Sequence, residues 1–148
     1  MIDLGPEAAE WVRVYSGPGL LIAAFVGATL VPVSSEAAFV AALLGGLAVP
    51  AALVWATTGN TFGCLVNYGI GRWGRERASD ALGRSRGGQA AVRWLERFGA
   101  PALWLSWLPV VGDPLTLAAG AARVRLGVFV PLVGGLRLAR YAALAWAV

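Results

Sequence analysis

Long apolar blocks separated by short polar segments predict a chain of helices. The first apolar block, 17–49, holds 33 residues, more than the roughly 20 that one membrane-spanning helix needs. Pro32 lacks an amide donor and Glu36 is charged, and both are costly at the centre of a spanning helix. We therefore predict that 17–49 is a re-entrant element, which breaks inside the membrane and returns to the side it entered from. The segment before it, 1–16, is predicted to lie at the interface.

The next block, 50–71, has the length of one spanning helix and a proline in its first turn. It leads into the basic segment 72–98, where seven of the twelve arginines meet only three acidic residues. The second part of this segment places Ala91, Leu95 and Phe98 at helical spacing, which predicts an amphipathic interfacial helix. Three glycines are expected to separate that helix from the residues before it: Gly83, Gly87 and Gly88.

The second half of the chain repeats this plan. Block 99–122 is apolar but interrupted by Pro109 and Asp113, so we predict a second re-entrant element. Block 126–148 then forms a closing spanning helix. If the basic segment is cytoplasmic, as the positive-inside rule favours, both termini lie on the outer side and the two re-entrant elements open to opposite sides.

Similar motifs at the two breaks indicate an inverted repeat, whose binding site is expected near the midplane. The first motif is Pro32-Val-Ser34-Ser35-Glu36, and the second is Pro109-Val-Val-Gly112-Asp113-Pro114. Each is followed by a helix that carries a polar residue before a tyrosine: Asn67-Tyr68 in one half and Arg140-Tyr141 in the other. The predicted fold class is thus an all-α integral membrane protein in a single domain.

Composition supports the membrane assignment and narrows the chemistry. Hydrophobic residues make up 58% of the chain and charged residues 14%, against about half and a quarter in soluble proteins. The chain has no lysine or histidine, which excludes a histidine base or metal ligand. We therefore expect no metal site and no cofactor. We also expect no nucleic-acid partner, because the arginines fit a positive-inside loop. Cys64 is alone in an apolar run and is expected to be a small buried hydrophobe.

Four charges in the apolar blocks are the leading candidates for a site. Glu36 and Asp113 follow the two breaks, where capping a half-helix N-terminus is the structural alternative to a role in transport. Arg137 and Arg140 share one face of the last helix. In the functional reading the two arginines form an anion site for a phosphate, whose oxygens match the planar fork of a guanidinium. In the structural alternative they only form ion pairs with the two carboxylates. We predict that each carboxylate lies within reach of Arg137, Arg140 or Arg72.

Other polar residues of the blocks are candidates to line the same cavity. Asn60 and Asn67 share a face of helix 50–71 with Thr61 near them, and hydrogen bonding between helices is the equal alternative. Several glycines are predicted to allow close helix approach: Gly59, Gly63, Gly120, Gly134 and Gly135.

In ordered combination these residues resemble the YqaA-type branch of the DedA family, which carries the VTT domain. The resemblance covers about residues 30–148. It rests on the first motif, on Gly59-Asn-Thr-Phe-Gly63 with Asn67-Tyr68 and Gly71-Arg72, and on Trp107-Leu-Pro-Val-Val-Gly-Asp-Pro114 with Ala119-Gly120. It implies two facing re-entrant elements in a helical scaffold and a role in moving lipids across membranes. The acidic residue usual before the first proline and the arginine usual after the second are absent, so the substrate is not carried over.

The leading functional hypothesis is a transporter in the bacterial inner membrane that moves or scrambles phospholipid or polyprenyl phosphate. Arginines would receive the lipid phosphate, and Glu36 or Asp113 would couple transport to protonation. A small-solute or ion transporter is the close alternative. From other classes, an intramembrane hydrolase with Glu36 and Asp113 as a carboxyl dyad and a non-transporting scaffold stay open. Membrane lipids are the expected partners, and a second copy of the chain is a further candidate partner.

Overall fold

The computed structural model describes residues 6–29, 35–108 and 111–148, with side chains described from Ser16 onward. These ranges contain helices and no strand, so the predicted all-α class is confirmed for them. The elements are α1 (Pro6–Ala28), α2 (Ser35–Leu44), α3 (Val49–Trp73), α4 (Arg75–Gly83), α5 (Arg86–Phe98), the 3-10 helix η1 (Ala100–Trp107), α6 (Gly112–Ala121) and α7 (Leu126–Ala147).

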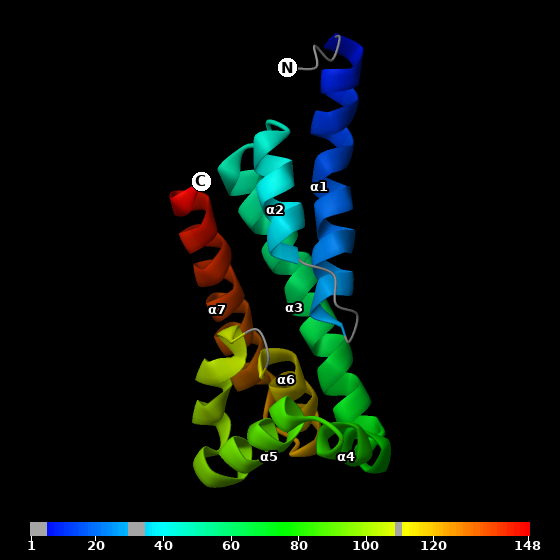
Figure 1. Ribbon diagram of the computed structural model, residues 1–148, viewed down its shortest axis with the longest axis vertical. Helices are drawn as coiled ribbons and strands as arrows, with labels where there is room; N and C mark the ends of the chain where they lie inside the picture. The colour runs from blue at the N-terminus through cyan, green and yellow to red at the C-terminus, as the bar shows by residue number, and fades with distance from the viewer. Residues whose placement is uncertain (1–5, 30–34, 109–110) are drawn as a thin grey trace.

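The long helices α3 and α7 extend along much of the molecule, and two pairs of elements, α1 with α2 and η1 with α6, approach them from opposite ends (Figure 1). α1 runs down from one end beside α3, and α2 runs back toward that end. η1 rises from the opposite end, and α6 returns to it. α4 and α5 lie across this second end, whereas α1 begins and α7 ends at the first. The basic segment and the start of α1 are therefore at opposite ends.

Local sequence explains where several helices begin and end. Pro50 occupies the first turn of α3, where its missing amide costs nothing. The Ser85 hydroxyl caps α5 by accepting a hydrogen bond of 2.9 Å from the Gly88 amide. Gly99 ends α5 with a φ of 65°, a value that favours glycine. The break between α4 and α5 falls at Arg84 and Ser85, so the prediction that glycines 87 and 88 separate the helices was wrong, because both lie in the first turn of α5.

The N-terminal boundary differs from the one expected from sequence. α1 continues from Pro6 to Ala28 with Pro18 inside it, so no break separates the described residues 6–16 from the block that follows. The expected break at Pro32 falls in 30–34, outside the described residues, as does the one at Pro109. On either side of 30–34 the structure shows two separate helices, because α1 ends at Ala28 and α2 begins at Ser35.

Close helix approach depends on glycines at two contacts. Between α1 and α3, a Cβ added at Gly59 would overlap the Leu21 carbonyl oxygen. Between α3 and α6, a Cβ at Gly120 would overlap the backbone of Tyr68. Gly134 has ordinary contact with Thr61, and Gly135 faces open space. The prediction for Gly135 was therefore wrong, because that side of α7 has no neighbouring helix to approach.

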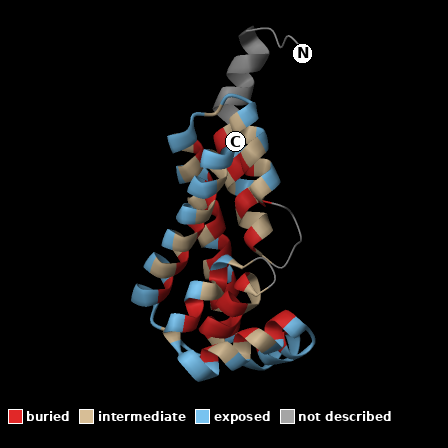
Figure 2. Ribbon diagram, turned by 60° about the vertical axis from the view of Figure 1, so that its left-hand side comes forward, coloured by how far each residue is buried: buried red, intermediate tan, exposed pale blue. Residues whose placement is uncertain are grey.

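Two apolar clusters form the core, and the outer faces of the long helices are also apolar. Phe39 packs on Tyr141 in one cluster, with ring centroids 5.0 Å apart, and Tyr68 packs on Phe129 in the other at 4.8 Å. Buried residues gather where the helices face one another (Figure 2). Large apolar side chains nevertheless point outward on both long helices: Val54, Phe62, Val66 and Ile70 on α3, and Val128, Val130 and Leu138 on α7. Such faces suit a lipid environment.

α3 and α7 are the two described helices that are long and apolar enough to cross a membrane. With 25 and 22 residues, they extend about 37 and 33 Å, against a hydrocarbon layer of about 30 Å. They correspond to the predicted spanning helices 50–71 and 126–148. α5 is amphipathic as predicted, but its apolar face, with Ala91 and Leu95, is buried against α4, α6 and η1.

Candidate functional site

Asp113 and Arg137 form an ion pair inside the helix bundle. Asp113 lies in the first turn of α6, and its Oδ1 is 2.9 Å from Nη2 of Arg137 on α7. The Arg137 side chain is 5% exposed and that of Asp113 27%. Arg137 Nη2 also donates to the Cys64 sulfur at 3.6 Å. Gly112 allows this arrangement, because a Cβ there would overlap the Ser106 carbonyl oxygen. This pair thus joins α3, α6 and α7.

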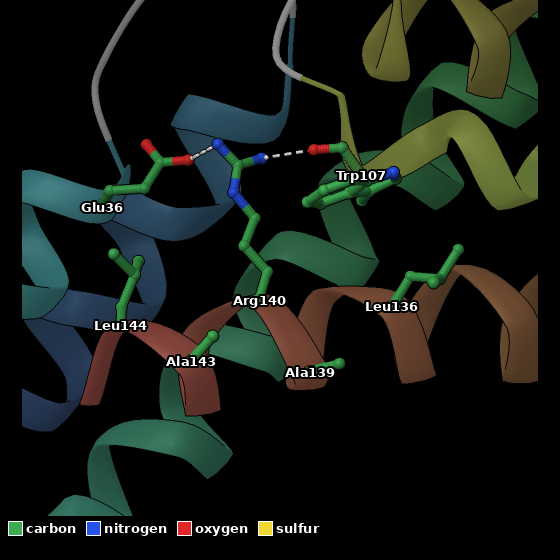
Figure 3. Close-up of a pocket in the computed structure, with 7 residues that line it drawn as sticks. All are labelled: Glu36, Trp107, Leu136, Ala139, Arg140, Ala143 and Leu144. Atoms are coloured by element: carbon green, nitrogen blue, oxygen red, sulfur yellow. Dashed lines mark hydrogen bonds and ion pairs between the residues drawn. The ribbon is translucent and has the colours of Figure 1, made fainter. Parts of the chain in front are cut away.

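Glu36 and Arg140 form a second ion pair nearer the surface. Glu36 lies in the first turn of α2, and its Oε1 contacts Nη2 of Arg140 on α7. Their side chains are 29% and 20% exposed. Nη1 of Arg140 donates to the main-chain carbonyl of Trp107, the last residue of η1, at 3.3 Å. Arg140 therefore connects α2 with η1, two elements that belong to different halves of the chain (Figure 3).

The predicted pairing of each carboxylate with an arginine is confirmed for Arg137 and Arg140, and not for Arg72. Arg72 lies near the end of α3 and donates to the Tyr68 hydroxyl at 3.2 Å, and that hydroxyl donates to the Val124 carbonyl at 2.6 Å. Whether the two ion pairs act on a substrate stays a prediction.

A polar layer crosses the bundle between the two apolar clusters. Nδ2 of Asn60 on α3 donates to the Tyr141 hydroxyl on α7 at 3.1 Å, and the Cys64 thiol donates to Oδ1 of Asn60 at 3.7 Å. Ser35 also hydrogen-bonds the Tyr141 hydroxyl. Cys64 is buried as predicted, but it connects Asn60 with Arg137 and is not only an apolar filler.

Asn67 extends this layer toward α1 and α6. Its Nδ2 donates to the Ala28 carbonyl at 2.8 Å and to the Thr116 hydroxyl at 3.4 Å, and that hydroxyl donates to the Asp113 carbonyl at 2.7 Å. Asn60 and Asn67 are 2% and 1% exposed. Apart from the bond from the Cys64 thiol to Asn60 within α3, their hydrogen bonds join different helices, which is the structural alternative weighed for them. They support the ion pairs and do not line the groove described below.

Four buried polar side-chain atoms have no hydrogen-bond partner among the described residues. They are Nε of Arg137 and the hydroxyls of Ser106, Thr57 and Thr61. An unpartnered polar atom in an apolar interior is costly, so these atoms have unused capacity to bind polar groups. Within the described ranges, no three Asp, Glu or Cys side chains converge where a metal ion could bind.

A groove of about 450 Å³ lies beside the Glu36 and Arg140 pair. Its lining comes from α2, η1 and mainly one face of α7: Glu36, Trp107, Leu136, Ala139, Arg140, Ala143 and Leu144. Figure 3 shows the guanidinium of Arg140 between the Glu36 carboxylate and the Trp107 carbonyl, with small and aliphatic residues of α7 below it. The groove is therefore apolar except for one ion pair, and Arg140 lies near the middle of its length.

The structure places the residues of the sequence motifs in different environments. Pro32, Ser34 and Pro109 lie outside the described residues. Ser35 is buried at the start of α2, and Gly112 and Gly120 permit close backbone contacts. Pro114 lies in the first turn of α6, where an amide has no partner in the helix.

Sequence reasoning missed the hydrogen-bonding roles of Tyr141, Thr116 and the Trp107 carbonyl. Tyr141 stands one turn after Arg137 on the same face of α7, a signal that was available. The Trp107 carbonyl had none, because main-chain acceptors are not visible in a sequence.

The two carboxylates bind different arginines, and no hydrogen bond joins them among the described side chains. The described side chains thus form no direct carboxyl–carboxyl contact, and the hydrolase alternative, which a shared water would also satisfy, stays a prediction.

Two relatives show which known proteins the chain is similar to. It is 42% identical over 127 residues to the inner membrane protein YqaA of Escherichia coli (strain K12), an alignment that covers 85% of this chain and 86% of that protein. It is 38% identical over 133 residues to a protein of Haemophilus influenzae, covering 84% of this chain and 82% of the relative. No protein-family model and no solved structure matches the chain. The YqaA resemblance is thus confirmed, and the wider DedA assignment stays a prediction.

Proposed function

We propose a function on the premise that the chain belongs to the family of the inner membrane protein YqaA, which also indicates an inner-membrane location. The proposal is a transporter that moves lipids with a phosphate headgroup between the two leaflets. Arg140 receives the phosphate, and the groove beside it receives part of the apolar chain. The observation that carries this proposal is the position of Arg140, paired with Glu36, on α7 in a groove whose other lining residues are apolar.

The chemistry of the groove supports this ligand class. A guanidinium presents several N–H donors in a planar fork that matches phosphate oxygens. The groove follows α7 from Leu136 to Leu144, two turns or about 12 Å. Apolar lining on both sides of Arg140 suits an amphiphile better than a hydrated ion, which would need polar groups along its path. Small-solute transport has no comparable observation in its favour.

The two ion pairs have different roles in this proposal. Arg137 is almost fully buried and is held by Asp113 and Cys64, so this pair positions α6 against α3 and α7. Arg140 and Glu36 are partly exposed at the groove, where a ligand can reach them. This pair is therefore the one that meets the phosphate in the proposed function.

The arrangement of the elements supports the proposed topology. We place α4 and α5 in the cytoplasm and both termini outside, so that the pairs α1/α2 and η1/α6 form re-entrant elements from opposite sides. Trp73 and Trp146, near opposite ends of the molecule, are 88% and 91% exposed. Tryptophans at two such levels are typical of the two membrane interfaces.

Reconstitution into liposomes tests the proposal. Fluorescent phospholipid and polyprenyl-phosphate reporters would be followed by chemical quenching of the outer leaflet. We expect the wild type to move at least one reporter, Arg140→Gln to lose at least 90% of that rate, and Arg140→Lys to keep part of it. Arg93→Gln on the outer side of α5 is the matched control, because it removes one arginine far from the groove.

Size-exclusion profiles would establish that the Arg140 variants remain folded. Equal reporter movement by Arg140→Gln and the wild type would overturn the assignment of this arginine. No movement of either reporter, together with flux of a small anion, would instead favour the small-solute alternative.

A further inference from the structure

Arg140 is already occupied by two acceptors that belong to opposite halves of the chain. Its Nη2 contacts the Glu36 carboxylate at the start of α2, and its Nη1 donates to the Trp107 carbonyl at the end of η1. We call this three-residue arrangement the Arg140 bridge. Figure 3 shows that the bridge crosses the groove at the level of the guanidinium. A phosphate that is to bind both terminal nitrogens through their paired donors must therefore compete with the Glu36 carboxylate for the charge of Arg140 and with both acceptors for position.

We infer that Glu36 is an internal competitor for the anion site, and that a phosphate group binds Arg140 by displacing Glu36 and Trp107 from the bridge. The inference deepens the proposed function, on which it rests, by naming what regulates access to its site. Because the displaced acceptors lie on α2 and η1, ligand binding also removes a direct link between the two halves of the chain.

The geometry explains why this bridge, and not the other ion pair, is the exchangeable one. Arg137 and Asp113 are 5% and 27% exposed, and Arg137 has Cys64 as a further acceptor in the core. Glu36 and Arg140 are 29% and 20% exposed and line the groove, so both can meet a ligand without separation of the bundle. The hydrogen bond to Trp107, at 3.3 Å, is longer than a typical N–H···O bond, so it is the weaker of the two contacts.

The exchange also predicts selectivity for the anion. A phosphate group offers three acceptor oxygens and can occupy both terminal nitrogens, which two separate acceptors now share. A carboxylate can also bind a guanidinium through two oxygens, but it carries less negative charge than a phosphate monoester and only replaces Glu36 by a group of the same kind. We therefore expect phosphate amphiphiles to bind in preference to carboxylate amphiphiles of the same chain length.

Binding measurements on the full chain in nanodiscs of zwitterionic lipid test this inference. The probes are dodecyl phosphate, dodecanoate and inorganic phosphate, with affinity measured by calorimetry. Glu36→Gln should bind dodecyl phosphate about 3 to 10 times more tightly than the wild type, because the competing charge is gone and the shape is kept. Glu76→Gln on the exposed side of α4 removes the same charge far from the groove and should change affinity less than twofold.

Hydrogen exchange provides an independent readout of the bridge. Dodecyl phosphate should raise amide exchange in α2 of the wild type, whereas Glu36→Gln should show raised exchange before any probe is added. A structural role of Glu36 alone would not make exchange in α2 depend on the probe.

Each outcome decides between the two proposals. If the wild type binds dodecyl phosphate and Glu36→Gln binds it no more tightly, the competitor inference is overturned and the proposed function stands. If inorganic phosphate binds as tightly as dodecyl phosphate, the competitor inference stands and the lipid as the source of the phosphate is overturned. If no phosphate probe binds the wild type or Glu36→Gln, both proposals are overturned.

Discussion

Replacement of Arg137 by alanine should destabilise the protein more than any other single change to the four charges. Arg137 is the most buried of them, and its removal leaves Asp113 without its ion-pair partner and Cys64 without its donor. A carboxylate that loses its partner inside a protein has no compensating charge and little access to water. The cost therefore arises mainly from the group that remains.

The magnitude follows from burial. Breaking a fully buried ion pair costs about 3 to 5 kcal/mol. The Asp113 side chain keeps 27% of its exposure, so we expect about 2 to 4 kcal/mol for Arg137→Ala. Arg137→Lys should cost about 1 to 2 kcal/mol, because an ammonium lacks the planar fork that serves Asp113 and Cys64 together. The double variant Arg137→Met with Asp113→Leu removes both charges and should lie within about 1 kcal/mol of the wild type.

Reversible unfolding in mixed micelles would measure these free energies, and Arg137→Met, Asp113→Leu and the double variant would form the double-mutant cycle. Arg93→Ala, an exposed arginine of α5, is the matched control and should change stability by less than about 0.5 kcal/mol. Additive single effects, with a coupling energy below about 0.5 kcal/mol, would refute the reasoning, since Arg137 and Asp113 would then not stabilise one another.

Two further predictions concern topology and helix packing. In a Cys64→Ser background, a cysteine at position 85 should react only with reagents that reach the cytoplasm, and labelling from the periplasm would contradict the proposed orientation. Gly120→Ala should lower the free energy of unfolding by about 1 to 3 kcal/mol, because the new methyl group meets the Tyr68 backbone. Gly135→Ala, where nothing lies within 4 Å, is the matched control and should not destabilise; equal losses in both variants would exclude the packing explanation.

The sequence by itself determined the class of protein, the spanning helices and the chemistry available. The length and hydropathy of 50–71 and 126–148 are properties of consecutive residues, so they predicted α3 and α7 to within a few residues at each end. The cost of burying charge required that Glu36, Asp113, Arg137 and Arg140 find partners. That argument does not depend on any particular packing, which is why the pairing was predictable.

Only the tertiary structure decided which groups meet. A spacing of three residues places Arg137 and Arg140 on one face of a helix, but it does not say which carboxylate each one binds. That choice depends on how α2, η1 and α6 are rotated and shifted against α7, and contacts among residues far apart in the chain set those positions. The groove, the Trp107 carbonyl on Arg140, the place of Cys64 in the polar layer and the open space at Gly135 arise in the same way. Helical periodicity specifies the face of a residue within its own helix, and only packing between helices determines what that face contacts.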